Sequence, residues 1–156
     1  MGSDYRFEAL QRIPRSREEV YAFFSDPGNL ERLTPPFLRF RILSPQPIPV
    51  QPGALIDYTL RLNGIPVRWR TRIETVDPGR GFTDVQLRGP YQRWHHRHEF
   101  RDIPGGTEMR DTVDYALPFG PLGALAHPLF VRPSLRRIFE FRRQAVEELF
   151  GQFPPG

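Results

Sequence analysis

The most constraining feature of the sequence is its long middle section, residues 37–117, where apolar and polar residues alternate in short runs separated by turn residues. A period of two is typical of β-strands that bury one face, so each run predicts a strand. Asn63-Gly64 indicates a two-residue hairpin, and Pro104-Gly105-Gly106 indicates another tight turn. Consecutive hairpins make an antiparallel meander. Its predicted strands cover residues 37–43, 54–62, 65–76, 81–88, 91–102 and 107–117.

The Asn63-Gly64 turn also predicts which residues face one another on the two strands that it joins. Leu62 should lie opposite Ile65, and the register then follows along both strands. On the outer face the same register puts Asp57 beside Arg70, so the apolar pairs and the charged pair agree. The predicted inner pairs are Leu60 with Val67, Tyr58 with Trp69, and Ile56 with Thr71.

Further elements are predicted on both sides of this meander. Residues 5–13 alternate and predict another strand, and Ser16 followed by Glu19 is a capping box that starts a short helix. A second short helix covers residues 29–33, before Thr34 and two prolines. A long helix is predicted after Pro133 with Ser134 as its cap, and its apolar stripe contains Leu135, Ile138, Phe139, Ala145, Val146, Leu149 and Phe150.

Together these elements predict one α+β domain over residues 1–156. A curved antiparallel sheet of seven strands must cover its apolar face, and the C-terminal helix is the only large element available to cover it. The two short helices connect the first and second strands. We expect the sheet to wrap around the long helix and to leave a cavity between them, which is the natural place for a ligand.

The composition excludes several kinds of chemistry. All 22 basic residues are arginine, so the net charge of +4 (22 − 18) arises without a lysine, and there is no cysteine. Schiff-base chemistry, a phosphate-binding lysine loop, disulfides and thiolate nucleophiles are therefore excluded. We expect no cofactor.

The sequence predicts neither a membrane-spanning segment nor a nucleic-acid partner. The N-terminus lacks the apolar run of a secretory leader, and residues 116–131, the longest stretch without a charge, are interrupted by prolines and too short to span a membrane. We therefore expect a cytoplasmic protein without a transmembrane segment.

Three arginines alternate with Trp69 on one predicted strand: Arg68, Arg70 and Arg72. This alternation points the arginines outward among acidic residues and the aromatic ring inward. We predict no nucleic-acid partner, although arginines and aromatics on one sheet can bind single strands.

Three of the four histidines lie in one predicted strand, and alternation sends His96 and His98 to one face. A four-residue loop, 103–106, then places Asp111 of the next strand opposite His98. A buried carboxylate needs a partner, so we expect these two residues to form a pair. The flanking pairs are Trp94 with Tyr115, His96 with Val113, and Phe100 with Met109.

This polar group has three interpretations. His98 and Asp111 could supply a general acid and base. They could instead orient a ligand or satisfy each other in the cavity wall, which is the interpretation we favour. His96 and His98 could also bind zinc with Asp111 as a third ligand. Because a bare His-x-His pattern has low specificity, we predict no metal site.

Two segments leave alternatives open. Residues 117–131 are too apolar for an ordinary loop and predict a mobile lid, a broken first half of the long helix, or a surface that touches a membrane transiently, helped by Arg132, Arg136 and Arg137. We favour the structural interpretation. In the strand 81–88, either the face with Thr83, Val85 and Leu87 or the face with Phe82, Asp84 and Gln86 can point inward.

The order of elements resembles the helix-grip fold of the SRPBCC superfamily, which contains START, birch-pollen-allergen and polyketide cyclase/dehydrase-like proteins. Three motifs carry the resemblance to its bacterial ligand-binding subgroup: residues 26–30 (Asp-Pro-Gly-Asn-Leu) with 33–36 (Leu-Thr-Pro-Pro), residues 89–91 (Gly-Pro-Tyr) with the Trp94–Phe100 strand, and Asp111-x-Val113-x-Tyr115 leading into 117–120. Residues 44–53 depart from the family's plant members, because they are proline-rich where those members carry a glycine-rich loop.

The resemblance implies that the chain binds or transports a small hydrophobic molecule, such as a lipid, a polyketide or an aromatic compound. One alternative is a cyclase or dehydratase that uses His98 and Asp111 as catalytic residues. Another is a protein-interaction module of the chaperone-activator type without a ligand. The oligomeric state stays open. The predicted ligand-binding residues are Ile56, Tyr58, Leu60, Val67, Trp69, Trp94, His96, His98, Phe100, Met109, Asp111, Val113, Tyr115, Ile138, Phe139 and Val146.

Overall fold

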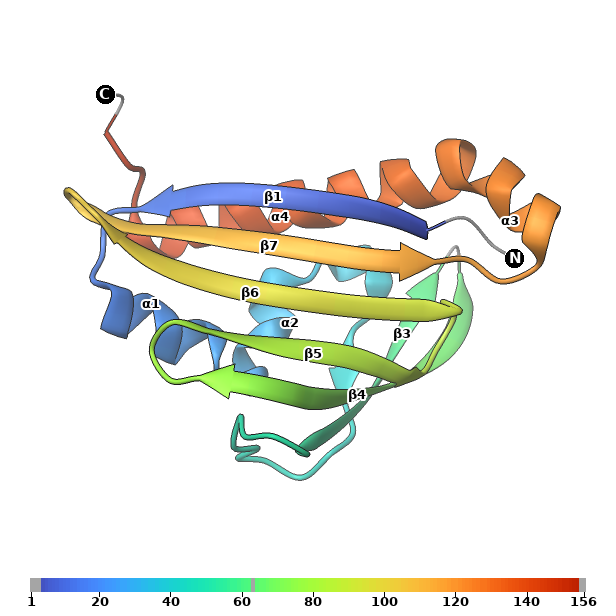
Figure 1. Cartoon of the computed structure of the whole chain (residues 1–156), viewed down its shortest axis with the longest axis horizontal. Coiled ribbons are helices and arrows are strands. Elements are labelled where there is room, and N and C mark those ends of the chain that lie inside the picture. Colours follow the sequence, from blue (N-terminus) through green and yellow to red (C-terminus); the bar gives the residue numbers. More distant parts are fainter. Residues whose placement is uncertain (1–3, 63, 155–156) are drawn as a thin grey trace.

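A computed structural model describes residues 4–62 and 64–154 and contains the predicted seven-stranded antiparallel sheet. The strand order is β1-β7-β6-β5-β4-β3-β2, so only the first strand leaves its place in the meander, to pair with the last (Figure 1). The long C-terminal helix lies along one side of the curved sheet, as the helix-grip fold requires. The strands are β1 (Asp4–Ile13), β2 (Arg41–Ile42), β3 (Leu55–Leu62), β4 (Ile65–Asp77), β5 (Gly81–Arg88), β6 (Arg93–Ile103) and β7 (Gly106–Ala116).

The registers predicted from turns are confirmed on both hairpins. Leu62 lies opposite Ile65, and Asp57 lies opposite Arg70, whose guanidinium donates two hydrogen bonds of 2.7 and 3.1 Å to it. Gly64 has a φ of 79°, as a turn of this kind needs, whereas Asn63 lies outside the described residues. On β6 and β7 all four predicted pairs, from Trp94–Tyr115 to Phe100–Met109, lie in register.

The strand predicted at residues 37–43 is wrong in its first half. A short 3-10 turn, η2 (Pro36–Leu38), occupies this position, and Arg39 follows it in the left-handed region with a φ of 48°. Pro35 and Pro36 have no N–H to donate to a ladder, so the chain cannot pair with a neighbouring strand until β2.

The short helices between β1 and β2 close one end of the space behind the sheet. They are α1 (Arg17–Phe24) and α2 (Leu30–Leu33), joined by the 3-10 turn η1 (Pro27–Asn29). The Ser16 side chain accepts a hydrogen bond from the Glu19 amide at 3.2 Å, which confirms the predicted helix start. Val20 and Phe24 of α1 are buried in a cluster with Phe100.

The terminal helix begins earlier than predicted. It runs without a break through α3 (Gly120–Ala126), a π-helical turn η3 (His127–Val131) and α4 (Arg132–Phe150), so Ser134 lies inside it and caps nothing. Proline usually interrupts a helix because it has no N–H to donate. Pro128 and Pro133 do not do so here, because each falls just after a change of helix type, where the normal hydrogen-bond pattern is already interrupted. Residues 117–131 therefore include the first part of the long helix. None of the helices in the described residues is long and apolar enough to cross a bilayer.

Two apolar clusters pack at opposite ends of β6 and β7. One contains Phe100 and Met109 together with α1, and the other contains Val113 and Tyr115 together with Leu135 of α4. His96, His98 and Asp111 lie between these ends along the same two strands. The core is therefore interrupted midway by polar groups, and this is where the candidate site lies.

Candidate ligand-binding site

A cavity of about 220 Å³ lies between the sheet, α2 and α4. Its wall is mainly apolar and contains a group of aromatic rings in contact with one another. Trp69 stacks on Tyr58 with ring centroids 5.8 Å apart and meets Trp94 edge-on at 5.2 Å, while Tyr91 packs against Trp94 at 4.7 Å. Burial raises the pKa values of the Tyr58 and Tyr91 hydroxyls, so both stay protonated at neutral pH.

The structure brings many of the predicted ligand-binding residues to this wall. They are Ile56, Tyr58, Leu60, Trp69, Trp94, His96, His98, Ile138 and Phe139. Others are packed in the core clusters instead: Phe100, Met109 and Val146 near α1, and Val113 and Tyr115 near Leu135. Val67 is half-buried on β4 and does not line the cavity.

Asp111 is placed differently from the prediction. Together with Met109 it borders a second hollow, of about 550 Å³, between β1, β7 and α4, and Phe139 and Arg142 separate this hollow from the aromatic cavity because they line both. Exposed Leu10, Arg136 and Arg143 also line the second hollow. The aromatic cavity, walled by buried rings, is therefore the better candidate for an apolar ligand.

Two polar residues at the cavity were not among the predicted site residues. Asp84 enters from β5, where the face with Phe82 and Asp84 points inward, which is one of the two orientations that the sequence left open. Arg142 enters from α4, and its side chain is 12% exposed. Its position was readable from the sequence: residue 142 lies three after Phe139 and four before Val146, on the apolar stripe itself.

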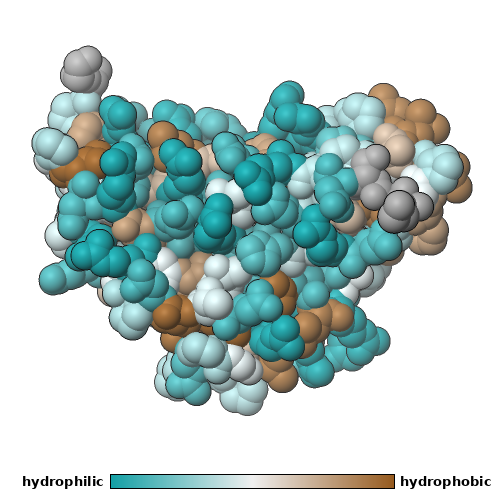
Figure 2. Space-filling model, in the orientation of Figure 1, coloured by the Kyte–Doolittle hydropathy of each residue, from teal (hydrophilic) through white to brown (hydrophobic). Residues whose placement is uncertain are grey.

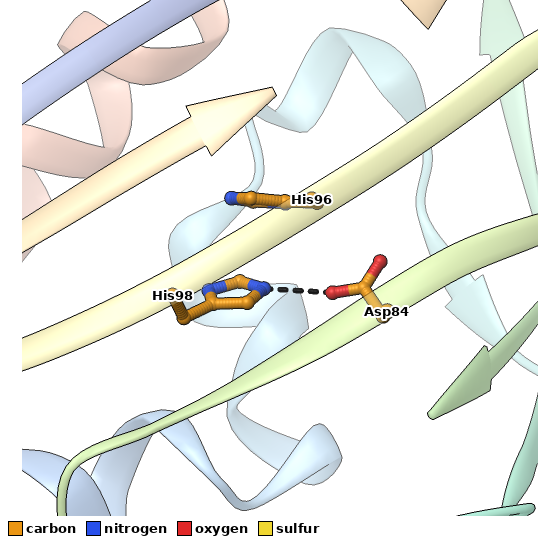
Figure 3. Close-up of side chains that lie close together, drawn as sticks. All are labelled: Asp84, His96 and His98. Atoms are coloured by element: carbon orange, nitrogen blue, oxygen red, sulfur yellow. Dashed lines mark hydrogen bonds and ion pairs between the residues drawn. The ribbon is translucent and has the colours of Figure 1, made fainter. Parts of the chain in front are cut away.

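These residues form one buried network. The Nε2 atom of His98 is 2.7 Å from Oδ2 of Asp84 (Figure 3). Nε2 of His96 is 2.8 Å from Oδ1 of Asp111. Asp111 Oδ1 is also 3.3 Å from Nδ1 of His98 and 3.3 Å from Nη2 of Arg142. The predicted neighbours His98 and Asp111 do meet, but each has its shorter hydrogen bond with a different residue.

The network separates the protonation behaviour of its members. Burial alone would raise the pKa of both carboxyls, but other interactions outweigh it. The charge of Arg142 and the hydrogen bonds from the histidines hold the pKa of Asp111 well below its usual range. The hydrogen bond from His98 lowers the pKa of Asp84. Burial would lower the pKa of His98, yet the two carboxylates beside it raise it overall. Burial and the charge of His98 lower the pKa of His96.

These pKa directions favour one distribution of charge. Asp84 and Asp111 favour the negative form and His96 the neutral form, while His98 favours the positive form more than an ordinary histidine does, beside the positively charged Arg142. A carboxylate only accepts hydrogen bonds, so the neutral His96 donates from Nε2 to Asp111 and keeps a lone pair on Nδ1. The two opposite pairs offset the cost of burying charge.

The network also leaves donors without partners. Among the described residues, the buried Nε1 of Trp69 and Nε of Arg142 have no hydrogen bond. Nδ1 of His98 has no well-directed hydrogen bond, although Oδ1 of Asp111 lies 3.3 Å away. All three side chains line the aromatic cavity. An unpaired buried donor is costly, so a ligand that supplies an acceptor would gain binding free energy here.

Asp84, His96 and His98 have the donor atoms of a metal site, all within 4.8 Å of one another. Asp84 stands where the sequence pointed to Asp111 as the third ligand. The arrangement does not favour a cation, because Arg142 brings a permanent positive charge and the carboxylates beside His98 favour the protonated form of that ring. The hydrogen-bonded network explains the geometry without a metal.

A curved sheet that grips one helix over an apolar cavity with a few buried polar groups defines a helix-grip domain. The sequence agrees: residues 13–142 match the family described as polyketide cyclase / dehydrase and lipid transport, and the chain belongs to this family. The resemblance to the SRPBCC superfamily is thereby confirmed. No curated protein sequence matches the chain.

Solved structures with the same fold have varied names. The Zhui aromatase/cyclase from Streptomyces sp. R1128 superposes with a TM-score of 0.72 at 16% identity, over 92% of each chain. A major latex-like protein from Panax ginseng gives 0.66 at 11% identity, over 98% of this chain and 100% of that one. A nucleoside-diphosphate sugar epimerase from Corynebacterium glutamicum gives 0.64 at 27% identity, over 91% of this chain but only 28% of that one.

Proposed function

We propose that the protein binds a small, uncharged, flat aromatic molecule of the polyketide type, with an oxygen of the ligand held at the polar end of the cavity. The observation that carries this proposal is the junction of an aromatic wall with a charge-balanced network that contains unpaired donors. An apolar site with a few converging polar groups is the usual form of a small-molecule site.

The size and wall of the cavity support a compact ligand. A volume of about 220 Å³ is below the range of about 300–1,000 Å³ typical for drug-sized ligands. Two-chain lipids do not match such a space. Flat rings match the rigid faces of Tyr58, Trp69 and Trp94, because aromatic pairs gain energy from offset and edge-on contacts.

The charge of the network supports a neutral ligand. Asp84 and Asp111 are already offset by His98 and Arg142, so a carboxylate ligand would add a buried charge without a counter-ion. A phenol or ketone adds no charge, and its oxygen can accept a hydrogen bond from Trp69 or Arg142.

Equilibrium dialysis with three matched probes tests this proposal: naphthalene, naphthol and naphthoate. We expect naphthol to bind roughly 2- to 10-fold more tightly than naphthalene, the value of one added hydrogen bond, and naphthoate to bind most weakly. Tighter binding of naphthoate would remove the charge-balance argument. The absence of saturable binding by all three probes would overturn the proposal as a whole.

A second function, catalysis of cyclisation or dehydration, is favoured by one specific observation. His98 and His96 stack 3.7 Å apart at the cavity wall, and the pKa of one is raised while that of the other is lowered. Such a divergence separates an acid from a base. In a dehydration, neutral His96 would take a proton from carbon, and His98 would give a proton to the departing hydroxyl, which leaves as water.

The enzyme and carrier alternatives differ in what a single substitution changes. If His96→Gln keeps the affinity for naphthol but abolishes turnover of a β-hydroxyketone probe, the protein is an enzyme. If no turnover is found with the unmodified protein, the carrier function stands. The third alternative, an interaction module without a ligand, requires a filled interior, and the cavity counts against it.

A further inference from the structure

Five of the twelve exposed large hydrophobic residues among the described residues lie at the start of the long helix. Five side chains there, which we call the α3 patch, are between 60% and 80% exposed: Phe119, Leu122, Leu125, Leu129 and Phe130. Hydrophobic residues gather over α3 at the right end of the molecule (Figures 1 and 2). Monomeric proteins rarely leave such a continuous apolar area unused.

The outward orientation of the α3 patch is built into the fold. Gly123 and His127 form the buried face of this segment, and the backbone oxygen of Pro118 lies so close to Gly123 that no side chain would fit there. The Tyr115 hydroxyl is 2.6 Å from Nε2 of His127, whose ring also stacks on Tyr5 at 3.6 Å. The segment is therefore anchored by its own inner face, and the five apolar side chains cannot turn inward to join the core.

Along the chain, the charges that follow the α3 patch have one sign, and exposed Asp4, which lies opposite Ala116, is paired with Arg93. No aspartate or glutamate occurs between Asp114 and Glu140. Arg132, Arg136 and Arg137 follow the patch along the helix and are exposed. Within the described part of the chain, none of these three arginines forms an ion pair with a carboxylate, and Asp114 is already paired with Arg6. An anionic surface would complement this end of the molecule.

We propose that the α3 patch inserts into the surface of an anionic lipid bilayer, with Arg132, Arg136 and Arg137 at the level of the headgroups. Every exposed side chain from residue 119 to residue 130 is apolar. A protein partner normally donates and accepts hydrogen bonds around an apolar centre, whereas the hydrocarbon chains of a bilayer have no donors or acceptors. Apolar insertion beside arginines is the pattern of helices that lie in a membrane interface.

This proposal is independent of the proposed function, but it has a consequence for it. Ser134 and Leu135, one turn after Phe130, line the aromatic cavity. Arg137 also lies over the ring of exposed Phe37, next to Leu38 of the cavity wall. A bilayer at the α3 patch would therefore lie close to the residues through which a ligand reaches the cavity.

Co-sedimentation with vesicles tests the proposal. We expect the protein to bind vesicles that contain phosphatidylglycerol much more strongly than vesicles of phosphatidylcholine alone, and to lose binding at high salt. The double variant Leu122→Ser, Phe130→Ser should weaken binding at least about tenfold, because two large apolar side chains no longer enter hydrocarbon. Arg136→Gln with Arg137→Gln should weaken it about tenfold or more.

Two matched variants control for general effects. Leu10 is 50% exposed on β1, outside the α3 patch, so Leu10→Ser should bind as the unmodified protein does. Arg110 is exposed on β7, so Arg110→Gln removes one positive charge away from the patch and should change binding little. All replaced side chains are exposed, and circular dichroism confirms that each variant is folded.

Two outcomes would overturn the proposal. One is equal binding by the Leu122→Ser, Phe130→Ser variant and the unmodified protein. The other is the absence of vesicle binding together with a dimer in sedimentation velocity that Leu122→Ser dissociates, which would assign the α3 patch to a second copy of the chain.

Discussion

His96 and His98 stack with their ring centroids 3.7 Å apart, and yet the fold moves their pKa values in opposite directions. The difference follows from their carboxylate neighbours. His98 has Asp84 at 2.7 Å and Asp111 at 3.3 Å, whereas His96 is bonded to Asp111 alone and feels the positive charge of its neighbour. One strand thereby presents a proton donor and a proton acceptor side by side.

This divergence predicts two separate titrations. By proton NMR, the His98 ring should titrate above its ordinary pKa of about 6.5 and the His96 ring below it. Asp84→Asn should lower the pKa of His98, because the carboxylate that lies 2.7 Å from Nε2 of that ring loses its charge. The variants His96→Gln and His98→Gln assign the two resonances, and a shared midpoint for both rings would contradict the prediction.

The same pair predicts a pH dependence of stability. The pKa of His98 is raised by folding, so its contribution to the free energy of unfolding is complete below about pH 6.5 and is lost as the pH rises through the raised value. Urea unfolding at several pH values measures this loss. In Asp84→Asn the loss should shrink, and an unchanged pH profile in that variant would show that another group causes it.

Two aspartates on β7 should respond very differently to the same substitution. Asp111→Asn leaves Arg142 buried without a full counter-charge and should lower the free energy of unfolding by about 3–5 kcal/mol. Asp114→Asn breaks only the surface ion pair with Arg6, so its effect should be much smaller. Equal losses in chemical denaturation would mean that the buried network has no special energetic role.

Trp69→Phe separates the ring of this residue from its unpaired N–H. The aromatic wall persists, so affinity for naphthalene should change little. Affinity for naphthol should fall roughly 2- to 10-fold, because one hydrogen bond is lost. Tyr58→Phe, at the ring stacked on Trp69, is the matched control for small changes in packing. If both probes lose affinity equally in Trp69→Phe, the indole N–H does not contact the ligand.

His127 should control how firmly the α3 segment is held. Burial and the charge of Arg132 lower the pKa of His127, so its contribution to stability is present above about pH 6.5 and is lost as the pH falls through the lowered value. Hydrogen exchange followed by mass spectrometry should show faster exchange of residues 120–131 in acid, after correction for the intrinsic rate. His127→Phe keeps the stacking on Tyr5 and should remove this pH dependence.

The sequence predicted the features that depend on neighbouring residues and tight turns. The Leu62–Ile65 and Phe100–Met109 registers follow from turn length and alternation, and both are confirmed. The residues that make the cavity wall were harder to predict. Phe100 and Met109 face inward as expected, but α1 packs on them, and a short helix that covers part of a sheet face leaves no signal in the strands it covers.

Asp84 shows why the candidate site was incomplete. The inward face of β5 depends on its pairing with β4, and that pairing shifts register between Ile73 and Thr75, an irregularity that alternation cannot predict. Arg142 was missed for a different reason. It lies on the apolar stripe of α4, where a charged residue is expected only if it has a buried partner. That partner is Asp111, which lies on a strand far away in the sequence, so helix periodicity alone could not identify it.

The π-helical turn His127–Val131 has a consequence for the whole terminal helix. One extra residue in a turn shifts the residues that follow by about 100° around the helix axis. In a regular helix Leu135 would lie about 80° around the axis from buried His127, and the shift brings the two residues to nearly the same face. Leu135 and Val146 face the protein interior, while Leu122 and Phe130 face away from it. A single hydrogen-bonding irregularity thus keeps one buried face along the whole terminal helix and leaves the α3 patch on the exposed face.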